Sequence, residues 1–343
     1  MEKINYLQTY QKFTKGLSKK VKDIFDRRFG VKSGQVETLE SIGKSLGITR
    51  ERVRQIEEAG FNHVKKNHKD SLDVIFAEFG SYFAKKGGFK KEDLVLEELA
   101  GKKNKPYVLF LLTLGGDRFK RVSAKKDFHY FWLANPASDK QVKDTLENIV
   151  KDIDSQKQLL DKNQMISTFA SKHNISQEAV ASYIEISKKI QESKDGKLGL
   201  ITWPEIKPRG VRDKAFLVFK KEKKPLHFRL IAQLIDGLGY NGEDKKAHPQ
   251  TVHNELIKDT RFVLVGRGTY ALAEWGYVPG TIKDIITKVL KDTQEAVHQA
   301  DKVKAVQDQR ILAKTTIPTN SKNKKFFSKN EDGKYILRET QLS

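Results

Sequence analysis

The most informative hydrophobic pattern of the chain lies between residues 38 and 58. Leu39, Ile42 and Leu46 recur at helical spacing and form one short apolar face. Gly47 follows directly and can take the left-handed conformation that ends a helix. The pattern therefore predicts a short helix that packs through one face and stops at a tight turn.

A second helix is predicted directly after this turn. Thr49 can cap it, so that it begins at Arg50, and Val53 and Ile56 would point toward the first helix. The opposite face is polar and carries Arg50, Glu51, Arg52 at its flank, Arg54 and Gln55. Two short helices joined by a tight turn, with a polar outer face on the second, are typical of a helix-turn-helix.

The polar face carries the side-chain types that read base edges in the major groove of DNA. Arg can bond a guanine with two hydrogen bonds, Gln can bond an adenine in the same way, and Glu can accept from a cytosine amino group. Runs of Arg and Glu are also common on ordinary solvated helix faces, where they pair at i, i+3 and i+4. The turn chemistry before this helix favours the DNA-reading interpretation.

The stretch from Leu17 to Lys66 resembles region 4 of the housekeeping sigma factors of bacterial RNA polymerase, the domain that reads the minus-35 promoter element. The resemblance rests on Arg27-Arg28-Phe29-Gly30, on the segment TLESIGKSLGI from Thr38, and on the run from Thr49 to Glu57. It implies two partners, double-stranded DNA and bacterial RNA polymerase. By resemblance, bases would be contacted by Arg50, Glu51 and Gln55. Phosphates would be contacted or flanked by Arg28, Leu39, Glu40, Thr49, Arg52 and Arg54.

Composition supports a polyanionic partner. The 343 residues include 65 Lys plus Arg against 44 Asp plus Glu, a formal charge of +21. No cysteine is present, which excludes disulfides and thiolate zinc sites. The first residues lack a secretory pattern, and no run reaches the ~18 apolar residues that a membrane span needs. We therefore expect a cytoplasmic, nucleoid-associated protein without a membrane partner.

Pairs of short strands joined by a polar turn recur later in the chain. They are predicted at 118–122 with 128–133, at 261–265 with 269–272, and at 325–327 with 334–337. Helical patterns precede them, as in winged helices. The predicted fold is therefore mainly α with small β wings (α+β), a tandem array of helix-turn-helix and winged-helix domains. The predicted domains are residues 1–69, 70–137, 138–208, 209–278 and 279–343.

The segment from Gly210 to Trp275 resembles the HARE-HTH winged-helix domain, which is also found in the delta subunit of RNA polymerase. The resemblance rests on the run KPLHF from Lys224, on the helix through Ile231 and Ile235, and on the residues from 259 to 272. It implies a module associated with DNA or with polymerase, without contact residues to carry over.

Residues 138–208 contain a pattern that repeats the first helix-turn-helix. A constant shift in numbering places Ile166 on Leu39 and Val180 on Val53, with the predicted turn at corresponding positions. The face predicted to be exposed carries no Arg and consists of Gln177, Glu178, Ala181 and Ser182. The same fold therefore need not read bases. The nearby Lys188, Lys189 and Lys197 could meet phosphates.

Enzymatic chemistry is not indicated. The eight His are dispersed without the spacing that puts two metal ligands on one helix face, and no phosphate-binding Gly loop or nucleophile motif is present. We predict no catalytic residues, no metal site and no cofactor. The favoured hypothesis is a sequence-specific transcription regulator, sigma-like but without the promoter-melting region. The alternative is an RNA polymerase accessory subunit or partial sigma factor whose winged helices bind protein.

Overall fold

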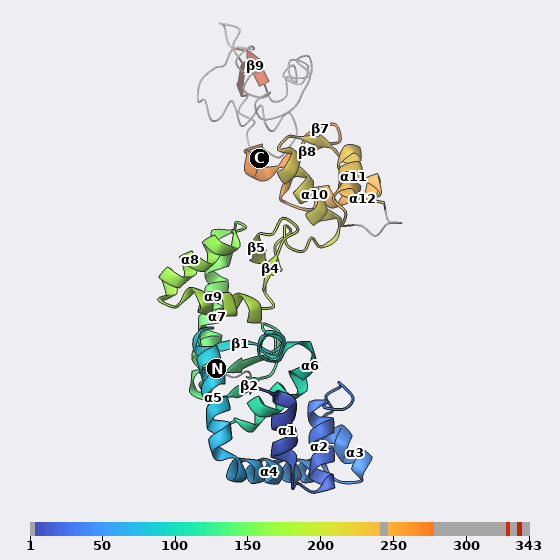
Figure 1. The fold of residues 1–343 in the computed structure, drawn as a ribbon. Helices are drawn as coiled ribbons and strands as arrows, with labels where there is room; N and C mark the ends of the chain where they lie inside the picture. Colours follow the sequence, from blue (N-terminus) through green and yellow to red (C-terminus); the bar gives the residue numbers. More distant parts are fainter. Residues whose placement is uncertain (1–3, 241–245, 278–326, 330–334, 338–343) are drawn as a thin grey trace, which may run out of the picture. The chain divides into compact units, whose positions relative to one another are not determined.

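The computed structural model describes residues 4–240, 246–277, 327–329 and 335–337. The chain divides into two compact units, Met1–Thr202 (unit 1) and Trp203–Ser343 (unit 2). Both consist mainly of helices with small antiparallel sheets, as predicted (Figure 1). Within the part of the chain that is described, no helix is long and apolar enough to cross a membrane.

The first part of unit 1 holds four helices around the predicted helix-turn-helix. Ser18, Thr38 and Thr49 cap the second, third and fourth helices, each accepting a backbone N–H three residues on. Gly30 and Gly47 end the second and third helices with φ values of 71° and 64°. In Figure 1 the fourth helix runs across the end of the first two. These helices are α1 (Tyr6–Thr14), α2 (Lys19–Phe29), α3 (Leu39–Leu46) and α4 (Arg50–Asn67).

A winged-helix arrangement follows. Its elements are α5 (Lys69–Ala84), β1 (Phe89–Lys91), α6 (Glu92–Leu114), β2 (Lys120–Val122) and β3 (Phe131–Leu133). The strands form an antiparallel sheet in the order β1-β3-β2, in which Phe89 and Lys120 both pair with Leu133. α6 bends at Gly101, whose φ of 63° interrupts the helix. The predicted wing is confirmed, and β1 adds a third strand to it.

The helices of these two parts share one hydrophobic core. Phe110 on α6 contacts Phe25, Phe29 and Phe61, with ring centroids 5.3, 5.4 and 5.9 Å away. The same core extends to Trp132 of β3. Helices on both sides of residue 69 therefore bury the same aromatic residues. The predicted domain boundary at residue 69 stays a prediction.

Residues 136–202 complete unit 1 with a second helix-turn-helix and a hairpin. Asn174 ends the first helix of the pair with φ of 50°, and Ser176 caps the second. Phe169 is fully buried between them. The helix-turn-helix geometry predicted for this segment is therefore present. The elements are η1 (Pro136–Ser138), α7 (Asp139–Gln156), α8 (Lys162–His173), α9 (Gln177–Ile186), β4 (Ile190–Glu192) and β5 (Leu198–Leu200).

Unit 2 contains the predicted second winged helix. Its elements are α10 (Gly210–Glu222), β6 (Leu226–His227), α11 (Phe228–Gly237), α12 (Pro249–Lys258), β7 (Phe262–Gly266), β8 (Thr269–Leu272) and η2 (Ala273–Trp275). The strand order is β6-β8-β7, and Phe219, Ile231, Val252 and Tyr270 lie in the core. The last predicted hairpin corresponds to the antiparallel pair β9 (Phe327–Lys329) and β10 (Tyr335–Leu337); the rest of residues 279–343 lies outside the described residues.

Candidate nucleic-acid interface

The turn between α3 and α4 is built by local hydrogen bonds and close backbone packing. Thr49 Oγ1 accepts the Arg52 N–H at 3.1 Å, and the Ile48 N–H donates to the Gly43 carbonyl at 3.0 Å. A Cβ at Gly43 would lie 2.7 Å from the Ile48 carbonyl oxygen, so only glycine fits here without displacement. The turn therefore sets the angle at which α4 leaves α3.

The apolar side of this helix pair matches the sequence pattern. Ile42 and Val53 are fully buried together with Ile24 of α2. Leu39 and Ile56 are half-buried at the edge of the same cluster. The inward positions predicted for α3 and α4 are thus confirmed, and the opposite side of α4 is left to solvent.

The outer face of α4 presents five exposed polar side chains, as predicted: Arg50, Glu51, Arg52, Arg54 and Gln55. Arg54 donates to Glu51 at 2.8 Å and to Glu58 at 3.0 Å, and Arg52 donates to Gln55 at 3.1 Å. Exposed pairs of this kind add little to stability because solvent and salt screen them, so DNA can replace them at little cost. The Arg54 hydrogen bond lowers the pKa of Glu51, which keeps its carboxylate ionised as an acceptor.

Arg28 is half-buried, unlike the exposed side chains on the outer face of α4, and its partners lie outside its own helix. Its Nη1 donates to the Glu37 carbonyl at 3.1 Å, and its Nε lies 3.3 Å from Oε1 of Glu57. Glu57 is 9% exposed, and burial raises the pKa of its carboxyl, while the nearby Arg28 charge opposes that shift. This pair links α2 to the inner side of α4, a role that the sequence pattern did not indicate.

The remaining predicted contact residues lie in the first turns of α3 and α4. Thr49 and Arg52 line an open hollow beside the turn with Gly43 and Gly47. Glu40 is exposed in the first turn of α3. The free N–H groups of such helix starts suit phosphate oxygens. The structure thus brings Thr49 and Arg52 together, and it places Arg28 on the neighbouring α2.

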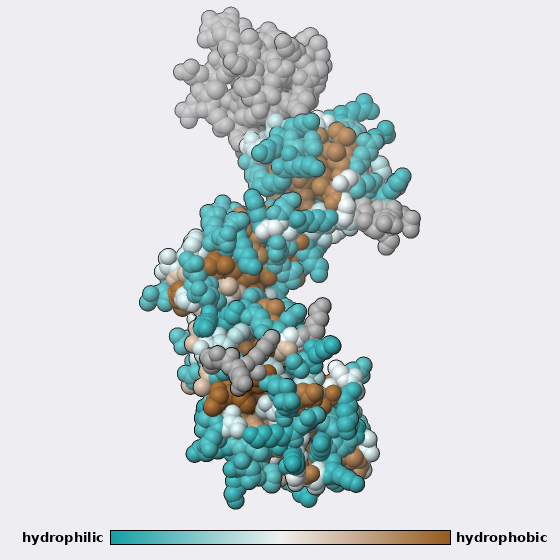
Figure 2. Space-filling model, in the orientation of Figure 1, coloured by the Kyte–Doolittle hydropathy of each residue, from teal (hydrophilic) through white to brown (hydrophobic). Residues whose placement is uncertain are grey.

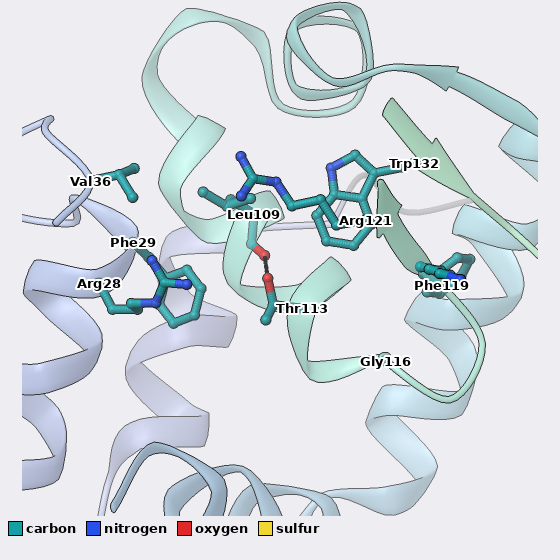
Figure 3. A pocket seen from close by; sticks show the side chains of 10 residues that line it. Arg28, Phe29, Val36, Leu109, Thr113, Gly116, Phe119, Arg121 and Trp132 are labelled. Atoms are coloured by element: carbon teal, nitrogen blue, oxygen red, sulfur yellow. Dashed lines mark hydrogen bonds between the residues drawn. The ribbon is translucent and has the colours of Figure 1, made fainter. Parts of the chain in front are cut away.

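A cavity of about 280 Å³ lies between α2, α6 and the wing of unit 1 (Figure 3). Figure 3 shows Arg28, Arg121 and Trp132 among its lining side chains. The cationic groups on its wing side are already paired, Lys120 with Asp139 at 2.9 Å and Arg121 with Glu92. The cations on the wing side of this cavity are therefore already engaged within the protein, and we assign the cavity no ligand. Among the described residues, no group of His, Asp and Glu is arranged to hold a metal ion.

In unit 2, α12 is the second helix of the packed pair α11 and α12, and it precedes the strands of the wing. Its exposed side chains are chemically different from those of α4, with Gln250, Thr251 and Asn254 along one side and Ile257 64% exposed near its end. Gln250 and Asn254 are joined by a hydrogen bond of 3.2 Å. This surface was not predicted residue by residue, because the sequence resemblance carried no contact positions.

Two helices joined by a glycine-ended turn, with a polar outer face on the second, define the N-terminal part as a helix-turn-helix of the DNA-binding class. Residues 15–66 match the family model described as Sigma-70, region 4. Residues 210–275 match the HARE-HTH family model, whose description names a restriction endonuclease HTH domain. Both resemblances read from the sequence, and their order along the chain, are confirmed.

Three sigma factors match this chain over region 4. RNA polymerase sigma factor sigB of Arabidopsis thaliana is 36% identical over 64 residues, 19% of this chain and 11% of the relative. RNA polymerase sigma factor SigA of Nostoc is 34% identical over 62 residues, which are 18% of this chain and 16% of the relative. RNA polymerase sigma factor SigA1 of Synechococcus elongatus is 36% identical over 56 residues, which are 16% of this chain and 14% of the relative. The chain therefore spans a small part of these relatives, and together with the family match they support a sigma-like DNA-binding role in transcription.

Proposed function

We propose that this chain is a sequence-specific DNA-binding protein of transcription that recognises a minus-35-type promoter element through α4. The observation that carries the proposal is the exposed set of Arg50, Glu51 and Gln55 on a capped helix within a sigma region 4 match. These three side chains can distinguish base pairs in the major groove, at about 1–3 kcal/mol for each bidentate contact.

Backbone contacts would position α4 without reading sequence. Thr49 and Arg52 lie at the amino end of α4, and Leu39 and Glu40 lie in the first turn of α3. The backbone N–H groups at each helix start would bind phosphate. Arg54 sits on the outer face and would exchange its carboxylate partners for phosphate. Arg28 would act by holding α2 against α4 and by adding positive charge at the edge of this surface.

The sigma region 4 match also supports association with RNA polymerase, which we include in the proposal. A second candidate function is an RNA polymerase accessory subunit whose winged helices bind protein. The observation that favours it is the exposure of three large apolar side chains on unit 2, Leu230 (42%), Ile257 (64%) and Leu264 (41%). In neither case do we propose an enzyme or a bound cofactor.

Selection of bound sequences from a random duplex pool by the full-length chain tests the first proposal. We expect enrichment of an element similar to TTGACA, and we expect Arg50→Ala and Gln55→Ala each to reduce affinity by about 1–3 kcal/mol at the affected base pair. Asn62→Ala is the matched control, because Asn62 is exposed on the same helix beyond the base-reading turns. Equal binding of selected and scrambled duplexes would contradict sequence-specific reading.

Capture of RNA polymerase in the presence of nuclease separates the two candidates. If the first proposal holds, capture through the sigma-like module should persist under nuclease and should not change when Ile257 and Leu264 on unit 2 are replaced. If unit 2 binds the polymerase directly, capture should persist, and Ile257→Asp with Leu264→Asp should abolish it while leaving the selected DNA sequence unchanged.

A further inference from the structure

The preceding winged helix covers part of the outer face of α9, the second helix of the second helix-turn-helix. Ser182 is fully buried, and its Oγ donates to the Lys86 carbonyl at 2.8 Å. Ala179 lies so close to Gly87 that a Cβ there would be 2.5 Å from the Ala179 Cα. The prediction that Ser182 lies on an exposed face is therefore wrong, because a segment distant in sequence docks on it. Gln177 and Glu178 at the start of α9 are exposed, as predicted, and Ala181 is half-buried. The covered side leaves α9 little free surface to insert in a DNA groove.

A buried ion pair fixes this docking. Lys90 on β1 is 4% exposed, and its Nζ lies 2.6 Å from a carboxylate oxygen of Glu185 on α9 and 3.6 Å from Glu98 on α6. A buried ammonium without its partners would be strongly destabilising, so this ion pair favours one docked arrangement of β1 and α9. Phe89 and Tyr183 pack beside it with ring centroids 4.6 Å apart.

The same docking joins two loops into one surface, which we call the lysine platform: residues 123–130 of the wing and residues 187–189 after α9. The His129 N–H donates to the Ile186 carbonyl at 2.8 Å, and the Lys188 N–H donates to the Asp127 carbonyl at 2.9 Å. Lys188 Nζ also donates to the Lys125 carbonyl at 2.7 Å. These bonds fix the backbone of both loops against each other.

The lysine platform carries an excess of positive charge. Lys125 and Lys126 are exposed, Lys188 and Lys189 are half-buried, and Asp127 pairs with Lys189 at 2.9 Å. Lys188 uses one of its three N–H donors on the Lys125 carbonyl, so its charge and its other donors stay available.

The pKa of His129, at the edge of this platform, responds to the positive charges around it. Its pKa is lowered first by burial and then by the charges of Lys91 and Lys188, with Asp93 opposing. The depression agrees with the positive charge that the geometry assembles.

We propose that the lysine platform binds the phosphate backbone of duplex DNA that flanks the element read by α4. The proposal rests on the proposed DNA-binding function and deepens it by separating two contacts in unit 1. The first helix-turn-helix reads bases, and the second holds the backbone through the loop after α9, since the winged helix covers part of α9 and its exposed start carries no cation. Lysine suits this task because its ammonium is a point charge that attracts phosphate without selecting a base.

The test is the salt dependence of binding by the full-length chain to a long duplex that contains the selected element. The variant Lys125→Gln, Lys126→Gln, Lys188→Gln removes three charges from the platform. We expect the slope of log affinity against log salt concentration to fall by about 0.9 for each phosphate that the variant no longer neutralises. Affinity should fall by the same factor for selected and scrambled duplexes, and the selected sequence should not change.

The matched control removes three exposed lysines from α7 and α8 with the same change in net charge: Lys140→Gln, Lys151→Gln and Lys162→Gln. This control should retain the wild-type slope. A double variant, Lys125→Gln with Lys126→Gln, leaves the inter-loop bond of Lys188 intact and should show an intermediate slope.

Equal slopes for the platform variant and the control would overturn the proposal, as would a loss of affinity confined to the selected element. A platform variant that binds DNA normally but no longer captures polymerase would assign the surface to protein and also overturn it. If wild type shows no sequence preference, the proposed reading by α4 fails, yet a reduced slope in the platform variant would still support the backbone contact.

Discussion

At the scale of single residues, the geometry of the first helix-turn-helix depends on two contacts that lie beneath its polar surface. Gly43 allows the Ile48 carbonyl to approach within 2.7 Å of where a Cβ would stand. Glu57 and Arg28 face each other at 3.3 Å beneath the reading face. Both features act on DNA binding indirectly, through the position of α4, and each can be changed without touching a base-reading side chain.

Gly43→Ala should destabilise the turn between α3 and α4 by about 1–3 kcal/mol, because the added methyl group has no room against the Ile48 carbonyl. Hydrogen exchange of α3 and α4 amides measures the effect, and DNA affinity should fall with it. Gly80→Ala on α5 is the control, since a Cβ there meets nothing within 4 Å and should stabilise by about 0.5–1 kcal/mol. Equal responses at the two glycines would contradict the steric explanation.

Glu57→Gln should change the pH dependence of local stability around α4. Burial raises the pKa of Glu57 above its ordinary value of 4.5, so the folded state holds this proton more tightly than the unfolded chain. The stabilising contribution is therefore complete below the unfolded pKa and is lost as pH rises through the folded pKa. Glutamine resembles the protonated carboxyl, so the variant should gain stability relative to wild type as pH rises from acid to neutral.

The measurement for Glu57 is hydrogen exchange of α4 amides in wild type and variant, compared at each pH. Glu58→Gln is the control, because Glu58 is exposed on the same helix and pairs with Arg54. A difference between wild type and Glu57→Gln that stays constant with pH would show that burial does not perturb this carboxyl.

At the scale of elements, α6 is part of the sigma-like module as well as of the winged helix. Its second half places Phe110 among three aromatic residues of α2 and α4, while Gly101 bends the helix before that contact. In the same way β1 docks on α9. Elements that the sequence assigns to separate modules therefore support each other within unit 1.

Phe110→Ala should destabilise α2 and α4 together with α6 by about 3–5 kcal/mol, because it leaves a cavity at the point where the three helices meet. Faster hydrogen exchange in all three helices, with reduced DNA affinity, is the expected result. Phe169→Ala on α8 is the matched control, since both side chains are fully buried but Phe169 lies in the second helix-turn-helix. Unchanged exchange in α2 and α4 of the Phe110 variant would show that the two modules are energetically independent.

At the scale of the whole molecule, the chain of charge +21 divides into two compact units, and the face of their described residues shown in Figure 2 is mainly hydrophilic. Such a charge makes association with DNA dependent on counterion release. It also allows more than one unit to contribute contacts, which the comparison of unit 1 with the full chain can resolve.

The affinity of the full-length chain for duplex DNA should fall steeply with salt, and the slope should exceed that of residues 1–202. Each additional phosphate contacted by the rest of the chain adds about 0.9 to the slope. Binding measured across a salt series for both proteins tests this. Equal slopes would indicate that the part after residue 202 does not contact DNA and would favour its role in binding protein.

The sequence by itself determined the local features of this protein: the cap at Thr49, the glycine turn before it, the exposed set on α4 and the strand pairs of the wings. These depend on residues within a few positions of each other, so their chemistry is visible in the periodicity. Only the tertiary structure decided that Phe110 fills the core of the first module, that Ser182 is buried, and that Lys90 lies between Glu98 and Glu185. Each of these contacts joins segments far apart in the chain, and helical or strand periodicity carries no information about which distant surface will cover a given face.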